Sequence, residues 1–208
     1  MPEAFEAPGV RGTLHRPDTP NHNAIALTHG AGSNSDAKLL VRLAEAFAGH
    51  GYLVLRYDLP FRQQRPGGSP FPAGAARDRE GIAMAVDALR PMVSGRIFAG
   101  GHSYGGRQTT MVATERSHLA DALLLLSYPL HPPKRPEQLR TAHFPQLHTP
   151  ALFVHGNRDP FGTLDEMRQA LALVPGRHDL LPVEKAGHDL GPAGQLAEEI
   201  LSRLTALL

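Results

Sequence analysis

The sequence predicts an α/β protein in which helices cover both faces of a mostly parallel sheet of about seven strands. Short apolar runs alternate along the chain with segments in which apolar residues recur every three or four positions. That alternation is typical of parallel sheets, whose strands are joined by helices. The predicted strands are residues 12–16, 24–29, 52–58, 96–102, 122–128, 151–156 and 179–185.

Helices are predicted between these strands, because each segment gathers its apolar residues on one face. Thr163 and Glu166 have the spacing of a capping box, which predicts a helix start at this point. The predicted helices are residues 36–48, 75–90, 105–115, 163–174 and 193–208. We find neither an internal repeat nor a linker, so residues 1–208 are predicted to form a single domain.

Two proline-rich segments, residues 59–74 and 129–150, follow predicted strands and show no helical periodicity. They are expected to lie over the carboxyl edge of the sheet as loops, with one short helix at 136–142 in the second. The prolines break any longer helix in residues 129–150, and a segment this short cannot bury a core of its own. The fold is therefore predicted to have no cap domain.

The composition excludes several classes of function. Lys and Arg number 21 against 20 Asp and Glu, so the net charge of +1 gives no basic excess for binding nucleic acid. The absence of Cys excludes disulfides, thiolate metal sites and a cysteine nucleophile. The N-terminus lacks the apolar core of a signal peptide, and no apolar run reaches the roughly eighteen residues of a membrane span. We expect a cytoplasmic protein that binds neither nucleic acid nor membrane.

The segment Gly101-His102-Ser103-Tyr104-Gly105 matches the G-x-S-x-G pattern of a nucleophile elbow. It lies between a predicted strand and a predicted helix, the setting in which such a turn presents a strained, exposed serine. Gly101 and Gly105 are expected to let neighbouring chains approach the turn closely. A phosphate-binding turn at a helix start is the alternative, but no Lys follows in the manner of a P-loop.

A serine hydroxyl needs a base to take its proton and an acid to orient that base. Asp159 and His188 follow Ser103 in the chain, each just beyond a predicted strand, so all three are expected to meet at the carboxyl edge of the sheet. Asp179 begins a strand and is therefore expected at the opposite edge, and His155 is interpreted as a structural residue. A turn-forming role for Asp159 and a surface-loop position for His188 are the alternatives.

The tetrahedral intermediate of acyl transfer carries an oxyanion that needs hydrogen-bond donors. The turn His29-Gly30-Ala31-Gly32 follows a predicted strand, and the backbone N–H of Ala31 or Gly32 is predicted to be one donor. The N–H of Tyr104, the residue after the nucleophile, is predicted to be the other. The twelve His residues show no spacing typical of metal ligands, so we expect no metal and no cofactor.

Three arginines, Arg62, Arg65 and Arg107, lie near the predicted edge of the site. Arg62 and Arg107 are predicted to contact substrate, and all three could favour an anionic substrate. The alternative is that they are solvated charges of loops and a helix.

A family resemblance rests on six segments: HGAGSNSD, RYDLPF, GGHSYGGR, SYPLHPPKRPEQLRTAHF, LFVHGNRDPFG and AGHDL. From about residue 10 to its end, the chain resembles the small, lid-less α/β hydrolases related to dienelactone hydrolases. More narrowly, it is similar to the branch named for a testis-expressed protein and for a subunit of a histone-acetyltransferase complex. The resemblance implies an α/β-hydrolase fold with Ser103, Asp159 and His188 at the triad positions. Ser103 stands where dienelactone hydrolase itself has Cys.

The predicted function is a serine hydrolase that cleaves a small ester through an acyl-enzyme. Ser103 is the predicted nucleophile, His188 the general base and then general acid, and Asp159 the residue that orients His188. The expected partner is a small-molecule acyl substrate, and a homodimer is possible. Thioesterase or small-peptidase activity from the same triad is one alternative, and a non-catalytic interaction scaffold is another.

Overall fold

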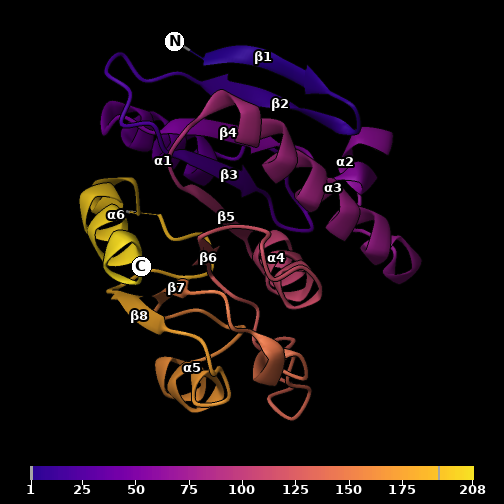
Figure 1. Ribbon diagram of the computed structural model, residues 1–208. Helices are drawn as coiled ribbons and strands as arrows, with labels where there is room; N and C mark the ends of the chain where they lie inside the picture. Colours follow the sequence, from indigo (N-terminus) through magenta and orange to yellow (C-terminus); the bar gives the residue numbers. More distant parts are fainter. Residues whose placement is uncertain (1, 192) are drawn as a thin grey trace.

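Eight strands form one sheet in residues 2–191 and 193–208, the part of the chain that the computed structural model describes (Figure 1). The strand order is β1-β2-β4-β3-β5-β6-β7-β8. The pairs β1–β2 and β2–β4 are antiparallel, and the other pairs are parallel, as the sequence predicts. The strands are β1 (Pro2–Ala7), β2 (Val10–His15), β3 (Ala24–Thr28), β4 (Leu53–Tyr57), β5 (Ile97–His102), β6 (Ala122–Leu126), β7 (Ala151–Gly156) and β8 (His178–Val183).

The strand that the sequence did not predict is β1, which lies at the edge of the sheet. It pairs with β2, from Pro2 opposite His15 to Ala7 opposite Val10. Its side chains are exposed or half-buried, so the sequence PEAFEA can form a strand without an apolar run. A search for buried strands therefore passes over it.

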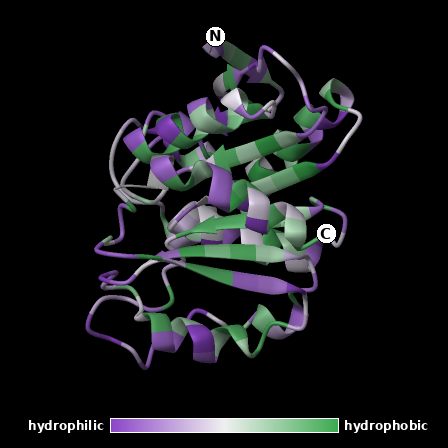
Figure 2. Ribbon diagram, turned by 90° about the vertical axis from the view of Figure 1, so that its left-hand side faces the viewer, coloured by the Kyte–Doolittle hydropathy of each residue, from purple (hydrophilic) through white to green (hydrophobic). Residues whose placement is uncertain are grey.

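Helices cover both faces of the sheet, as predicted (Figure 1). α1 (Lys38–Gly49) and α6 (Ala197–Ala206) pack on one face. α3 (Ala75–Leu89), α4 (Tyr104–Glu115) and α5 (Leu164–Leu171) pack on the other. The strands between them supply apolar side chains to both layers, and the middle of the sheet is accordingly green in Figure 2. The remaining helical segments are α2 (Pro60–Gln64) and the 3₁₀ turns η1 (Pro72–Gly74), η2 (Arg90–Met92), η3 (Phe144–Gln146) and η4 (Ala193–Leu196).

The proline-rich segments follow β4 and β6, at the carboxyl edge of the sheet. In residues 59–74, α2 begins at Pro60, because a missing N–H costs nothing in the first turn of a helix. In residues 129–150, the prediction of a short helix at 136–142 is wrong. The N–H of Arg140 donates to the carbonyl of Leu130 (2.8 Å), ten residues back, so the segment folds into turns instead. Within the described residues no cap domain covers the sheet edge.

The carboxyl ends of β3, β5, β7 and β8 lie at the same edge of the sheet, because these strands run parallel. The chain leaves that edge at residues 29–37, 103, 157–163 and 184–190. These segments carry the predicted nucleophile, base and acid. No helix within the described residues combines the length and the apolar character that crossing a membrane requires.

We expect Leu124→Ala, on β6, to lower the free energy of unfolding by about 3 kcal/mol, because it leaves a cavity in a closely packed layer. Leu124 is fully buried and faces the layer of α1 and α6. The matched control is Leu173→Ala, whose side chain is 48% exposed, with an expected change below about 0.5 kcal/mol. Urea denaturation measures both, and equal losses would contradict this placement of the core.

Candidate active site

Ser103 occupies the turn between β5 and α4, with φ of 52° and ψ of −114°. Its N–H donates to the carbonyl of Leu126 (2.8 Å), and its carbonyl accepts from the N–H of Arg107 (2.9 Å), which fixes the turn to β6 and to α4. Gly101 and Gly105 allow the close approaches that the sequence suggested. A Cβ on Gly105 would lie 2.6 Å from the carbonyl oxygen of His29, and one on Gly101 would lie 2.7 Å from that of Thr28.

The structure brings Ser103, His188 and Asp159 together. The Ser103 hydroxyl lies 2.8 Å from Nε2 of His188, and Nδ1 of the same ring lies 2.8 Å from Oδ2 of Asp159. Because a carboxylate only accepts, Nδ1 carries the proton and Nε2 is free to accept from the serine. A hydroxyl, an imidazole and a carboxylate in this order can generate a serine nucleophile.

Asp159 is held as a buried carboxylate. Its Oδ1 accepts from the N–H of Phe161 (2.9 Å), and its side chain has no exposure to solvent. Burial alone would raise the pKa of Asp159, but the hydrogen bonds from His188 and from the Phe161 N–H hold it below its usual value. His155, read from the sequence as structural, donates from Nε2 to the carbonyl of Gly162 (2.8 Å) in the same loop. Burial lowers the pKa of His155.

Two aromatic rings flank His188 and were not singled out from the sequence. The ring of Phe161 lies 4.2 Å from that of His188, and the ring of His102 lies 5.0 Å from it. His102 donates from Nε2 to the carbonyl of His188 (2.7 Å). Burial is the main reason that the pKa of His102 falls to about 4, which keeps this ring neutral at pH 7. The sequence could have indicated these two rings only by position, since His102 directly precedes Ser103 and Phe161 follows Asp159 by two residues.

The predicted oxyanion donors lie beside the serine. We call residues 29–37 the oxyanion loop. A Cβ on Gly30 would lie 3.4 Å from Cβ of Ser103, so this loop packs directly against Ser103. The N–H groups of Ala31 and Gly32 donate to no carbonyl among the described residues. Ala31 and Tyr104 line one cavity together, whereas a Cβ on Gly32 would meet nothing within 4 Å. This arrangement favours Ala31 over Gly32 as the loop's donor.

Arg62 differs most from its predicted role. It was expected to contact substrate, but its guanidinium is buried, with the residue 5% exposed. Nε donates to the carbonyl of Ser33 (2.7 Å), and Nη2 donates to the carbonyls of Ala31 (3.1 Å) and Gly68 (3.0 Å). Nη1 donates to the carbonyl of Arg65 (3.2 Å). Arg62 therefore holds the oxyanion loop from α2 and has little capacity left for a substrate.

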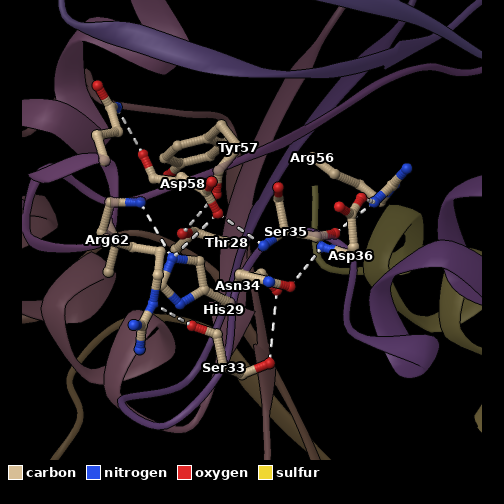
Figure 3. A network of polar contacts seen from close by, with 12 residues as sticks. Thr28, His29, Ser33, Asn34, Ser35, Asp36, Arg56, Tyr57, Asp58 and Arg62 are labelled. Carbon is tan, nitrogen blue, oxygen red and sulfur yellow. Dashed lines mark hydrogen bonds and ion pairs between the residues drawn. The ribbon is translucent and has the colours of Figure 1, made fainter. Parts of the chain in front are cut away.

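A polar network reaches the rest of the oxyanion loop from the end of β4 (Figure 3). Oδ1 of Asp58 accepts from the N–H of Ser35 (2.8 Å), and Arg56 donates to the carbonyl of Ser35 and to Oδ1 of Asp36 (3.1 Å). Nε2 of the buried His29 accepts from the N–H of Leu59 (3.1 Å). The sequence held one signal of this network, an arginine in the middle of an apolar strand.

The remaining charged residues that the sequence analysis considered lie around the edge of the site or away from it. Arg65 donates to the carbonyl of Ser69 (2.9 Å) and stacks on the exposed ring of Phe71. Arg107 lies on α4, one turn after Ser103, and lines the cavity that Ala31 and Tyr104 share. Asp179, the rejected acid, pairs with Arg203 of α6 (2.9 Å). Within the described residues, no group of three or more His, Asp or Glu side chains is placed to hold a metal ion.

The fold and this edge of the sheet are those of an α/β hydrolase. Residues 21–206 match the alpha/beta hydrolase domain family, and the chain belongs to it. The proposed protein-lysine deacylase ABHD14B of Pongo abelii is 26% identical over 173 residues, which are 80% of this chain and 75% of that protein.

Two solved structures share the fold over nearly their whole length. An α/β serine hydrolase homologue from Coxiella burnetii has a TM-score of 0.76 at 16% identity, over 98% of this chain and 97% of that one. Dienelactone hydrolase from Anabaena variabilis has a TM-score of 0.75 at 20% identity, over 98% of each chain. At such identities the likeness speaks for the fold alone.

We expect Arg62→Gln to lower kcat by about tenfold to a hundredfold, because small displacements of an oxyanion donor are costly. The change removes most of the bonds that fix the carbonyls of Ala31 and Ser33. Steady-state kinetics on an ester that the parent cleaves measures the effect. Arg90→Gln is the matched control. Arg90, the C-cap residue of α3, also donates to two backbone carbonyls, those of His118 and Leu119, but contacts no residue of the oxyanion loop. An unchanged kcat in Arg62→Gln would contradict the role of Arg62.

Proposed function

We propose that this α/β hydrolase is a serine hydrolase that cleaves a small carboxylic ester through an acyl-enzyme. The observation that carries the proposal is the double contact of His188, with Oγ of Ser103 on one side and the buried carboxylate of Asp159 on the other. The absence of a cap over the described sheet edge favours small, water-soluble substrates over long acyl chains.

In the proposed mechanism, Oγ of Ser103 attacks the acyl carbonyl carbon while Nε2 of His188 takes the hydroxyl proton. The carbonyl oxygen becomes an oxyanion and accepts from the N–H groups of Tyr104 and Ala31. Asp159 stabilises the imidazolium. The tetrahedral intermediate then expels the alcohol, which takes the proton from His188, and leaves the acyl group on Ser103.

Water completes the cycle. His188 takes a proton from the water molecule, whose oxygen attacks the acyl carbon and forms a second tetrahedral intermediate. That intermediate collapses, the ester bond to Ser103 breaks, and His188 returns the proton to Oγ. The products are the carboxylic acid and the free enzyme, and no cofactor is required.

The similarity to ABHD14B favours a second candidate, removal of an acyl group from a lysine side chain by the same residues. Thioester or small-peptide cleavage would use the same chemistry with another leaving group. A panel of esters, thioesters and acyl-lysine peptides separates these reactions. Four further expectations stay predictions. They are the narrower branch resemblance, a cytoplasmic location, a possible homodimer, and the absence of a nucleic-acid or membrane partner.

Ser103→Ala tests the proposal most directly. The parent protein should react covalently with a fluorophosphonate probe and cleave a p-nitrophenyl ester. The variant should lose labelling, and its kcat should fall by several orders of magnitude, leaving what binding and the oxyanion donors supply. Circular dichroism checks that the variant is folded. Equal labelling of parent and variant, or no reaction of the parent, would show that the serine is not a nucleophile.

Asp159→Asn should lower kcat by up to about 10⁴-fold, because an amide favours the wrong tautomer of His188. Asp179→Asn is the matched control: it removes the same charge near the start of β8, where Asp179 pairs with Arg203. Its kcat should stay within about twofold of the parent, since Asp179 touches none of the three proposed catalytic residues. A reversed ranking of the two variants would reassign the acid.

A further inference from the structure

A cavity of about 430 Å³ opens between the oxyanion loop, residues 69–75 and α4. Its walls include Ala31 and Tyr104, which carry the proposed oxyanion donors, and also Phe71, Arg107 and Met111. A group bound in this cavity therefore lies beside the two residues that carry the proposed oxyanion donors.

The position of the cavity relative to His188 indicates which part of a substrate enters it. His188 must reach the leaving group in order to protonate it, so the leaving group lies on the side of that ring. Among the described residues, neither His188 nor Phe161 lines the cavity. The group that faces it is consequently the acyl chain, on the far side of the carbonyl.

Arg107 is a charged group of this cavity that has no carboxylate partner among the described residues. Its Nε is buried without a hydrogen bond, and among residues 2–191 and 193–208 no carboxylate lies within 4 Å of its guanidinium. The other arginine of the cavity, Arg79, pairs with Glu115 (3.1 Å). The buried carboxylate of Asp78 is also engaged, since it accepts from the hydroxyl of Tyr104 (2.7 Å) and from a backbone N–H.

A second guanidinium lies close to Arg107. Burial, and then the charge of the nearby Arg107, lower the pKa of Arg140. Arg140 donates to the carbonyl of Pro129 (3.3 Å), so its place is set by the loop after β6. Arg140 does not line the cavity, so it adds positive charge near Arg107 but no second contact for an anion bound there.

We propose that Arg107 selects acyl groups that end in a carboxylate, as in half-esters of short dicarboxylic acids. Arg107 lies in the first turn of α4, its N–H bonded to the carbonyl of Ser103 (2.9 Å), and it lines the same cavity as Ala31 and Tyr104. A short acyl chain held on Ser103 can therefore place a terminal carboxylate against the guanidinium. This inference rests on the proposed serine hydrolase function and names its substrate class.

The test compares two p-nitrophenyl esters of equal chain length, the mono-ester of adipic acid and the ester of hexanoic acid. The adipic mono-ester ends in a carboxylate, and the hexanoic ester ends in a methyl group. Rates with Ser103→Ala are subtracted, since they report hydrolysis that does not depend on Ser103. The measured quantity is the ratio of kcat/KM for the acidic ester to kcat/KM for the neutral ester. We expect the parent to favour the acidic ester, and Arg107→Gln to lower the ratio at least tenfold.

Two further variants make the result specific. Arg107→Lys keeps the charge but loses the bidentate geometry, so its ratio should fall between those of the parent and Arg107→Gln. Arg16→Gln removes an equal charge from a residue that lines a different cavity, and should leave the ratio unchanged. Fluorophosphonate labelling of each variant shows that Ser103 remains competent.

The outcomes separate this inference from the proposed function. Ser103-dependent cleavage of both esters, with the same ratio in the parent and in Arg107→Gln, would overturn the role of Arg107 and leave the esterase intact. An equal fall in the ratio for Arg16→Gln would show a general effect of net charge and would also overturn it. Failure of the parent to label or to cleave either ester would overturn both proposals.

Discussion

The contact between the β5–α4 turn and the end of β3 sets the geometry of the whole site. Ser103 adopts a left-handed backbone conformation that costs a residue with a side chain about 1–3 kcal/mol. It is held there because Gly105 can lie against the carbonyl of His29, at a distance that leaves no room for a Cβ. The same contact brings the oxyanion loop to the serine, since that loop begins at His29. One close approach of two backbones therefore positions both Ser103, the proposed nucleophile, and the groups proposed to stabilise the oxyanion.

The oxyanion loop needs support of another kind, because a loop has no ladder of strand bonds to satisfy its backbone. Arg62 and Asp58 supply it, the first by donating to loop carbonyls and the second by accepting from the N–H of Ser35 (Figure 3). The buried ring of His29 adds a bond at each nitrogen, to the carbonyl of Gly30 and from the N–H of Leu59. Burial lowers its pKa, so the ring stays neutral and keeps an acceptor at Nε2. The loop is thereby fixed before any substrate binds.

The sequence predicted the features that depend on local pattern. The strand–turn–helix order around Ser103 and the alternation of strands and helices are local patterns. The structure confirms the fold class that they predict. The edge strand β1 was not predicted, because pairing with β2 rather than burial of apolar side chains holds it in place. The helix expected at 136–142 failed for a related reason, since the bond from Arg140 to Leu130 closes a loop over ten residues. Pairing between neighbouring segments decides such cases, and the apolar periodicity of a single segment does not show it.

Arg62 and Arg107 show the same limit at the site itself. Both are arginines at the carboxyl edge, and composition and spacing give no reason to treat them differently. The structure separates them by their surroundings: carbonyls of three loop residues and of Arg65 surround Arg62, whereas Arg107 faces a cavity and has no carboxylate beside it among the described residues. A buried guanidinium must have its donors satisfied by the protein, but one at a cavity wall can leave them for a ligand. Arg107, which has no carboxylate partner among the described residues, is therefore the arginine that we propose to act in substrate choice.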